Sequence, residues 1–551
     1  MTVSPRLFLE LRTYNLEKFR ADLLAGLTVG IIAVPLAMAF AIASGVSPEQ
    51  GLVTAVIAGV VIGALGGTRL CVAGPTGAFI VVLYGILARY GWANLVICTI
   101  MAGAMLIAMG LLRLGGLIKF VPNSVVIGFT NGIAVLIAIS QVKDLLGLPI
   151  ERMPGEFFGI VKTLWSYLPQ THWPSLALTA ACFTFLKLWP ARWSERVPGP
   201  FLVLVLATLP VMFLDTGIAT IGSRFGEIHA GWPAPSIPKV TPEQLGSLIA
   251  PAMTIALLAA IESLLCAVVA DKQTRDRHDP NTELVAQGAA NILSPLFGGL
   301  AITSAIARTS ANIRNGAKTP VASIVHALTI LAVLLIAAPL ARHVPLPALA
   351  AILLWVAFNM GEWHAFRTMG RFKPMRNLIL LATFALTVLF DLTVAVEVGL
   401  LLATVLLIKR LTEAARFEFV QDLAREPDAP ALTLPAHSLG VRLRGALFFG
   451  VADRIREALT VPPETRVIVL DLLEVIYIDS TALETLIEAC TDLQQANCSV
   501  LVYGLGAQAR SLFDRSGLTE QKGEANLVAT KRLAVERARA LLAQASAEGN
   551  A

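Results

Sequence analysis

Charged residues are scarce in this sequence. Asp, Glu, Lys and Arg together make up 15% of its 551 residues, whereas soluble domains carry about 25%. The deficit is concentrated between about residues 22 and 410, where several apolar runs approach the ~20 residues that cross a bilayer. From about Phe417 onward, charged residues return at an ordinary frequency. These features indicate a polytopic helical membrane domain followed by a water-soluble domain.

Several other features are absent, and each absence excludes a class of protein. The six cysteines show no CxxC spacing and lie mostly in apolar runs, which favours buried, reduced thiols. We find no nucleophile–base pair, metal-ligand cluster or phosphate-binding loop, so we expect no enzyme, no metal and no cofactor. The first ~20 residues mix charges without an apolar core, so we expect no cleavable signal peptide. The net charge of +5 is explained by membrane topology rather than by nucleic-acid binding.

The lengths of the apolar runs predict about fourteen membrane segments. Two of these runs are unusually short, and both follow a Gly-rich break, at Val72–Gly77 and at Gly298–Ser304. The segments lie near residues 24–45, 51–66, 75–89, 92–112, 118–139, 173–190, 199–215, 248–270, 284–299, 303–313, 319–341, 346–360, 377–391 and 394–410.

The distribution of positive charge predicts the orientation of these segments. An even number of segments places both termini on one side, and short cytoplasmic loops are rich in Lys and Arg. With both termini inside an inner (plasma) membrane, the loops on the cytoplasmic side carry Arg69, Arg113, Lys119, Lys187, Arg192, Arg196, Lys272, Arg275, Arg277, Arg314, Lys318, Arg367, Arg371, Lys373, Arg376, Lys409 and Arg410. The opposite side has a mixed-charge loop at 142–165 and a polar, Pro-rich loop at 222–247.

The two short segments each come third in a half of seven segments. A unit with an odd number of spans, used twice, is inverted the second time, as in many secondary transporters. In that plan two helix N-termini meet near the midplane, where their free N–H groups bind an anion. The residues expected to form this site are Thr76, Gly77, Ala78, Phe79, Ser304, Ala305, Ile306 and Arg308.

Other interpretations of these residues stay open. The two Gly-rich breaks are also typical of ordinary loops. Thr76 and Ser304 are either hydroxyl donors to the anion or helix N-caps. Arg308 either supplies positive charge at the anion site, pairs with Glu262, or makes a structural contact.

Glu262 is a lone carboxyl within the apolar run 250–270. An ionised carboxylate at that depth costs roughly 2.5–3.5 kcal/mol on insertion scales, and the protonated form avoids this cost. A carboxyl that titrates inside a membrane is a proton carrier or a cation ligand. We therefore assign proton coupling to Glu262; the alternative is a carboxyl that stays protonated and hydrogen-bonds a neighbouring backbone group.

The segments Gly74–Phe79, His278–Gly288 and Ala305–Ile313 resemble the sulfate permease (SulP) family, bacterial relatives of the animal anion exchangers pendrin and prestin. The resemblance covers almost the whole chain. It implies a 7+7 inverted repeat with a core and a gate, elevator-like alternating access, and a homodimer with a cytoplasmic STAS domain. Substrates across the family include sulfate, bicarbonate, C4-dicarboxylates and halides.

Two departures from the family pattern bear on the transported ions. Some sodium-coupled relatives look to carry an Asp at the position of Glu262, with threonines around it. In this sequence the matching positions around Glu262 are Cys266 and Ile306. Fewer hard oxygen ligands make sodium a poorer coupling ion than the proton. Leu36 and Phe40 replace a Gln and a Tyr of the family pattern. This less polar wall favours a carboxylate with an apolar body, such as fumarate or succinate, over sulfate.

The last 120 or so residues alternate strands with helices, which indicates an α/β layer. Strands are expected at 440–445, 466–472, 475–478 and 499–503, and helices near 450–459, 480–497, 507–516 and 528–546. This pattern resembles a STAS domain, in which Thr481 matches a phospho-acceptor. The alternative is simple N-capping by Asp479 or Ser480. A basic face at 531–539 is solvated or touches lipid headgroups.

The expected organisation is a cytoplasmic segment at 1–21, a transport domain at 22–412, a linker at 413–431 and a STAS domain at 432–551. The two repeats occupy 22–217 and 248–410. The function expected is a proton-coupled anion symporter. The alternatives are an uncoupled exchanger or channel of the same fold, a nucleobase permease, and a membrane-anchored signalling module. Expected partners are a small inorganic or carboxylate anion, protons, membrane lipid, a second copy of the chain and a cytosolic protein that binds the STAS domain.

Overall fold

The computed structural model describes residues 4–116, 122–150, 153–154, 157–190, 198–213, 217–226, 231–236, 238, 242–371, 374–390, 392–423, 432–515 and 526–548. The loop residues Lys119, Arg192, Arg196 and Lys373 and part of the expected linker lie outside these ranges. The chain divides into two compact units, Met1–Leu401 and Leu402–Ala551. The division falls within α19 (Leu392–Ala414), before the boundary expected at residue 412.

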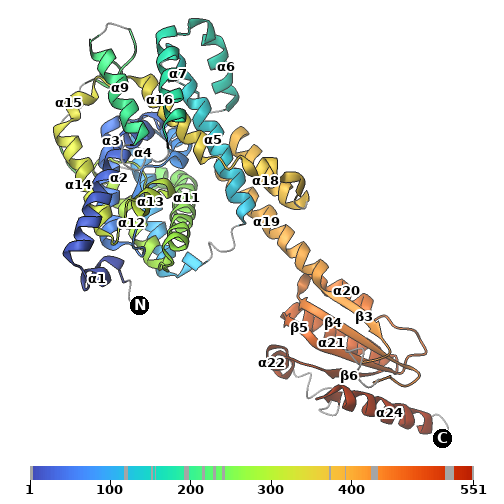
Figure 1. The fold of residues 1–551 in the computed structure, drawn as a ribbon. Coiled ribbons are helices and arrows are strands. Elements are labelled where there is room, and N and C mark those ends of the chain that lie inside the picture. The colour runs from blue at the N-terminus through green and yellow to red at the C-terminus, as the bar shows by residue number, and fades with distance from the viewer. Residues whose placement is uncertain are drawn as a thin grey trace. The chain divides into compact units, whose positions relative to one another are not determined.

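The first unit is helical (Figure 1). Among the described residues of this unit, five helices are long and apolar enough to cross a membrane: α2, α3, α4, α5 and most of α11. Its elements are α1 (Arg6–Leu11), α2 (Leu16–Ala43), α3 (Pro48–Leu65), β1 (Ala73–Gly74), α4 (Gly77–Leu111), α5 (Asn123–Leu146), α6 (Phe157–Tyr167), α7 (Trp173–Leu188), α9 (Gly199–Phe213), α10 (Ile221–Phe225), α11 (Pro242–Thr274), α12 (Pro280–Leu296), β2 (Thr303–Ser304), α13 (Ile306–Arg314), α14 (Val321–Ile336), α15 (Ala338–Ala341), α16 (Leu346–Met360), α17 (His364–Arg367) and α18 (Pro374–Leu389).

The two expected segments 75–89 and 92–112 are two helices that meet at a kink and share the label α4. The kink lies at Gly91, whose φ of 80° and ψ of 173° are not helical. Glycine adopts a positive φ without steric cost, so the chain changes direction there without a loop.

The helices of the first unit pack in two groups. In one group α4 packs on α11 and α12, and α14 packs on α2 and α3; in the other, α5 packs on α16 and α18, and α16 packs on α7. Glycines bring the α4 and α12 backbones into direct contact, because a Cβ on Gly103 would lie 2.6 Å from the carbonyl oxygen of Gly288. Close backbone approach of this kind is how membrane helices gain packing energy. The first group therefore forms a tightly packed body that carries both β1 and β2.

The second unit is an α/β domain. Its strands run in the order β3-β4-β5-β6-β7, with β3 antiparallel to β4 and the other pairs parallel. The strands are β3 (Arg416–Val420), β4 (Ser438–Leu447), β5 (Val467–Ile478), β6 (Ser499–Tyr503) and β7 (Leu527–Val528), and the helices are α20 (Ala452–Ala458), α21 (Ser480–Gln495), α22 (Ala507–Arg515) and α24 (Lys531–Glu548).

Two expectations for this domain need correction. The segment 413–431, expected as a linker, contains β3, in which Phe417 and Phe419 alternate with charged residues. This short edge strand is stabilised by its pairing with β4, which a local pattern does not reveal. The strands expected at 466–472 and 475–478 are one continuous strand, β5.

Candidate functional site

The two Gly-rich breaks of the sequence meet in a short antiparallel pairing at the centre of the first unit. Ala73 of β1 lies opposite Ser304 of β2, and Gly74 lies opposite Thr303. Helix α4 begins at Gly77 and helix α13 at Ile306, shortly after these strands. Because the strands are antiparallel, the chain leaves the pair at opposite ends. The structure thus brings the residues expected at the anion site, from both halves of the chain, into one place.

Neither helix has a side-chain cap at its N-terminus. Thr76 is the N-cap residue of α4 and Ala305 that of α13, and neither makes a side-chain capping bond. The first N–H groups of a helix have no partner within it and carry partial positive charge. The α13 end is open, since Ile306 is 46% exposed, whereas Phe79 of α4 is buried. Two uncapped helix N-termini are a site for an anion.

Glu262 lies beside the start of α4. The hydroxyl of Thr76 donates a hydrogen bond to Glu262 Oε2 over 3.1 Å. Thr76 therefore contacts the carboxyl instead of capping its helix. Glu262 is partly exposed. The next residue, Ser263, contacts the Thr303 hydroxyl at 2.8 Å and accepts a bond from Ser304 N at 3.2 Å.

Arg308 is buried next to Gly74 of β1. Its side chain lies against Gly74, where an added Cβ would overlap Nη1 and lie 3.2 Å from Cζ. It does not pair with Glu262, which corrects that reading of the sequence. Within the described ranges, Nη1 and Nη2 of Arg308 have no hydrogen-bond partner. A buried cation without a protein acceptor favours an anion in its vicinity.

Ser304 does not present its hydroxyl to the two helix ends. Its Oγ donates to Glu283 Oε1 at 3.3 Å and accepts a bond from Gln287 Nε2 at 2.8 Å. Both partners come from α12, and both are fully buried. Sequence reasoning did not single out Glu283, because an acid in the first turn of a helix ordinarily has a dipole explanation. The one available signal was its place within the family-like segment His278–Gly288.

Apolar side chains from other helices face the start of α4. A Cβ on Gly77 would lie 3.5 Å from Phe40 Cε1, 3.0 Å from Ile137 Cδ1 and 3.8 Å from Met360 Sδ. Ile137 and Met360 belong to α5 and α16, so the second helix group closes this side of the site. Phe40 therefore lies beside the start of α4, as the sequence predicts, and the side chains around it are apolar.

The position expected to distinguish sodium from proton coupling is filled by a thiol. Cys266 Sγ lies 3.2 Å from the Thr309 hydroxyl and 3.8 Å from Cys71 Sγ. Among the described residues, no cluster of three or more His, Cys, Asp or Glu residues could hold a metal ion. The donors around Cys266 are thus softer and fewer than a sodium ion prefers.

In the second unit, Asp479 caps α21. Its Oδ1 accepts from Ala482 N at 2.8 Å and its Oδ2 from Phe449 N at 3.0 Å. Thr481 is exposed in the first turn of this helix. The capping role anticipated for Asp479 is therefore present, and Thr481 lies where a helix N-terminus would tolerate an added phosphate.

Comparisons with known proteins identify both units. The sulfate permease family matches residues 19–383, and the STAS domain matches residues 430–530. The chain is 43% identical over 521 residues to the putative sulfate transporter YvdB of Bacillus subtilis, covering 93% of this chain and 96% of that protein. It is 32% identical over 523 residues to the bicarbonate transporter BicA of Picosynechococcus sp., covering 91% of each.

Solved structures agree with this assignment. The transmembrane domain of a cyanobacterium bicarbonate transporter BicA superposes with a TM-score of 0.64 at 32% identity, covering 71% of this chain and 98% of that one. The overall structure of SLC26A9 superposes with a TM-score of 0.86 at 19% identity, covering 96% and 92%; this likeness shows the fold. The expected fold class, a polytopic helical membrane domain with a small STAS domain, is confirmed. This chain therefore belongs to the sulfate permease family and is a membrane-embedded anion transporter rather than an enzyme.

Proposed function

We propose that this protein is a secondary active symporter that couples the entry of a small anion to protons. The observation that carries the proposal is the meeting of two uncapped helix N-termini at β1 and β2, with Glu262 hydrogen-bonded to one of them. The helix ends attract the anion, and Glu262 takes up the proton. Thr76 links anion binding to proton uptake, because it stands at the N-terminus of α4 and donates a hydrogen bond to the Glu262 carboxyl.

The substrate class follows from the charge and polarity around the site. Arg308 adds a buried positive charge next to β1, which suits sulfate, bicarbonate or a C4-dicarboxylate. Phe40 and Ile137 make the facing wall apolar, which favours a carboxylate with an apolar body. Two relatives bear names for sulfate and bicarbonate transport, so both anions belong in the test.

Alternating access by an elevator-type movement is supported by the two helix groups. The group around α4, α12 and α14 carries β1, β2, Glu262 and Arg308, whereas α5 and α16 face it from the other group. A body that contains the whole site and packs internally by close helix contacts can move as one unit. The facing wall is mostly apolar, so sliding along it breaks few polar contacts.

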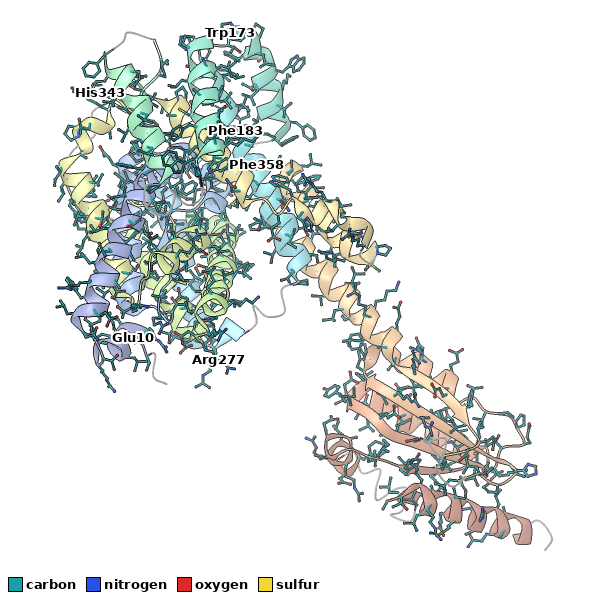
Figure 2. All side chains as sticks on the ribbon, viewed as in Figure 1. Glu10, Trp173, Phe183, Arg277, His343 and Phe358 are labelled. Carbon is teal, nitrogen blue, oxygen red and sulfur yellow. The ribbon has the colours of Figure 1, made fainter. Side chains whose placement is uncertain are left out.

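The proposed location is the inner (plasma) membrane with both termini in the cytoplasm. Figure 2 shows Glu10 and Arg277 at one end of the first unit and Trp173 and His343 at the opposite end. Arg6 bonds Asp276 at 3.0 Å, so the N-terminal helix lies at the Arg-rich loop expected inside. We further propose a homodimer, regulation at Thr481, and a cytosolic protein partner for the STAS domain; these rest on the family resemblance.

The test is uptake into proteoliposomes of labelled sulfate, fumarate and bicarbonate, each with and without an inward proton gradient. The variants are the wild type, Glu262→Gln and a control, Glu17→Gln, in which the replaced acid is exposed in the first turn of α2. A parallel series replaces the proton gradient with a sodium gradient. We expect one anion to accumulate with the proton gradient in the wild type and in the control, and accumulation to be lost in Glu262→Gln.

Two outcomes would contradict the proposal. Uptake that is indifferent to the proton gradient and to Glu262→Gln would indicate an uncoupled exchanger or channel of the same fold. Accumulation driven by sodium, in spite of the thiol at Cys266, would show that the coupling ion is wrong while leaving the anion site in place.

A further inference from the structure

A second carboxylate lies next to the anion site. Glu283 of α12 is fully buried, and its two oxygens accept four hydrogen bonds. Oε2 accepts from Gly67 N at 3.1 Å and from the Thr68 hydroxyl at 3.2 Å. Oε1 accepts from Gln287 Nε2 at 3.2 Å and from the Ser304 hydroxyl at 3.3 Å. Within the described part of the chain, no cation pairs with it, so these four donors compensate its burial.

The four donors come from both halves of the chain. Gly67 and Thr68 lie in the turn that leads into β1, and Ser304 lies in β2 at the start of α13. The approach to Gly67 is tight, since a Cβ there would overlap the carbonyl oxygen of Asp279 and lie 2.9 Å from Glu283 N. Only glycine allows the backbone N–H to come this close to α12. The carboxylate therefore joins β2 to the turn that precedes β1.

The Ser304 hydroxyl is held in one orientation. It donates to Glu283 and accepts from Gln287, while the Ser304 backbone N–H donates to Ser263 Oγ at 3.2 Å. Side-chain and backbone bonds thus attach Ser304 of β2 to both α11 and α12. The first N–H groups of α13 follow directly, so their direction depends on this arrangement.

We infer that Glu283 is a positioning residue for anion binding, which acts through Ser304 and the turn before β1 and does not itself carry protons. This inference rests on the anion site proposed above. Glutamine at position 283 offers an NH₂ group where a carboxylate oxygen now accepts two bonds, so one pair of donors would lose its acceptor. The helix ends would then hold the anion less well, although the rest of the protein would stay folded.

The test compares Glu283→Gln, Ser304→Ala and the double variant in the full chain. The control is Ser294→Ala, also on α12, which removes a buried hydrogen bond to the carbonyl oxygen of Leu300, beyond the end of the helix, without touching β2. We expect about a tenfold rise in the KM of the transported anion for Glu283→Gln, from the loss of hydrogen bonds to a charged group. In the Ser304→Ala background, Glu283→Gln should raise KM less than it does in the wild type, because the two residues share a contact and their effects are not additive. Ser294→Ala should leave KM unchanged.

A second readout needs no substrate, so it separates this inference from the proposed transport function. Hydrogen exchange followed by mass spectrometry, carried out well below the melting temperatures of both variants, should rise in residues 67–74 and 303–308 of Glu283→Gln and not in Ser294→Ala. Unchanged exchange in both segments would overturn the inference. So would full additivity of the two KM effects, or a variant whose proton dependence changes while KM does not, since the latter would make Glu283 a proton carrier.

Discussion

A side chain at Gly74 would occupy the space that the Arg308 guanidinium fills. Because Arg308 is buried, the displaced group would have no room nearby, and its charge would move away from the anion site. We expect Gly74→Ala to lower uptake at least about tenfold, in line with the loss of one interaction with a charged group. Gly85→Ala is the control, since a Cβ there meets nothing within 4 Å. Wild-type kinetics in Gly74→Ala would show that Arg308 does not contribute to binding.

The reactivity of the Cys498 thiol tests whether this side chain is buried in the folded α/β domain. Burial raises the pKa of its thiol from the usual 9.0 to about 11, and the side chain is 3% exposed. The thiolate is the reactive form of cysteine. We therefore expect the native thiol to be unreactive, because its raised pKa keeps it protonated and its burial keeps reagents away. We expect N-ethylmaleimide at pH 8 to leave Cys498 unmodified in the folded chain and to modify it in urea. Rapid modification of the native protein, detected by peptide mass, would contradict this packing.

At the scale of elements, Asp22 connects α2 to the start of α14. Its carboxylate accepts from Lys318 N at 2.6 Å, from Thr319 N at 3.0 Å and from the Thr319 hydroxyl at 2.5 Å, and it is fully buried. Removing it leaves buried donors without a partner, at about 1–3 kcal/mol each. We expect Asp22→Ala to lower the melting temperature of the detergent-solubilised protein clearly, whereas Glu17→Gln in the same helix should not. Equal melting temperatures for the two variants would contradict this role.

The N-terminus of α21 provides a second prediction at this scale. Asp479→Ala removes the helix cap and should cost about 1 kcal/mol, seen as faster hydrogen exchange in the first turn of α21 in the full chain. Asp453→Ala is the control, because that side chain is fully exposed on α20. Thr481→Asp should leave exchange unchanged, since a negative charge is favourable at this end of the helix. Slower exchange in Asp479→Ala than in the control would refute the capping assignment.

For the whole molecule, the sidedness of the first unit can be tested in intact cells. The six native cysteines are buried, so they add little background to labelling. We expect a membrane-impermeant maleimide to label His343→Cys from outside and to label Arg277→Cys only after the membrane is opened. This follows from the Lys and Arg bias of the loops and from the opposite ends at which the two residues lie (Figure 2). The reverse pattern would place both termini outside.

Much of this protein was determined by the sequence alone. Apolar run length defined the membrane domain, because a bilayer demands it, and two Gly-rich breaks at matching places marked the helix ends that meet at the site. A lone carboxyl in an apolar run singled out Glu262, because such a group is costly without a function. Alternating strands and helices identified the α/β domain; the likeness to known families then confirmed both parts.

Only the tertiary structure decided how the polar groups around the site are paired. Thr76 and Ser304 looked equivalent in sequence, yet Thr76 bonds Glu262 and Ser304 bonds Glu283. Arg308 turned toward Gly74 rather than toward Glu262. Thr76 and Glu262 are 186 positions apart in the chain and Ser304 and Glu283 only 21, yet neither pairing could be read from the sequence, because hydrogen bonds depend on distances and angles that a linear pattern does not contain. The edge strand β3 was hidden for the same reason, since its stability comes from its partner strand.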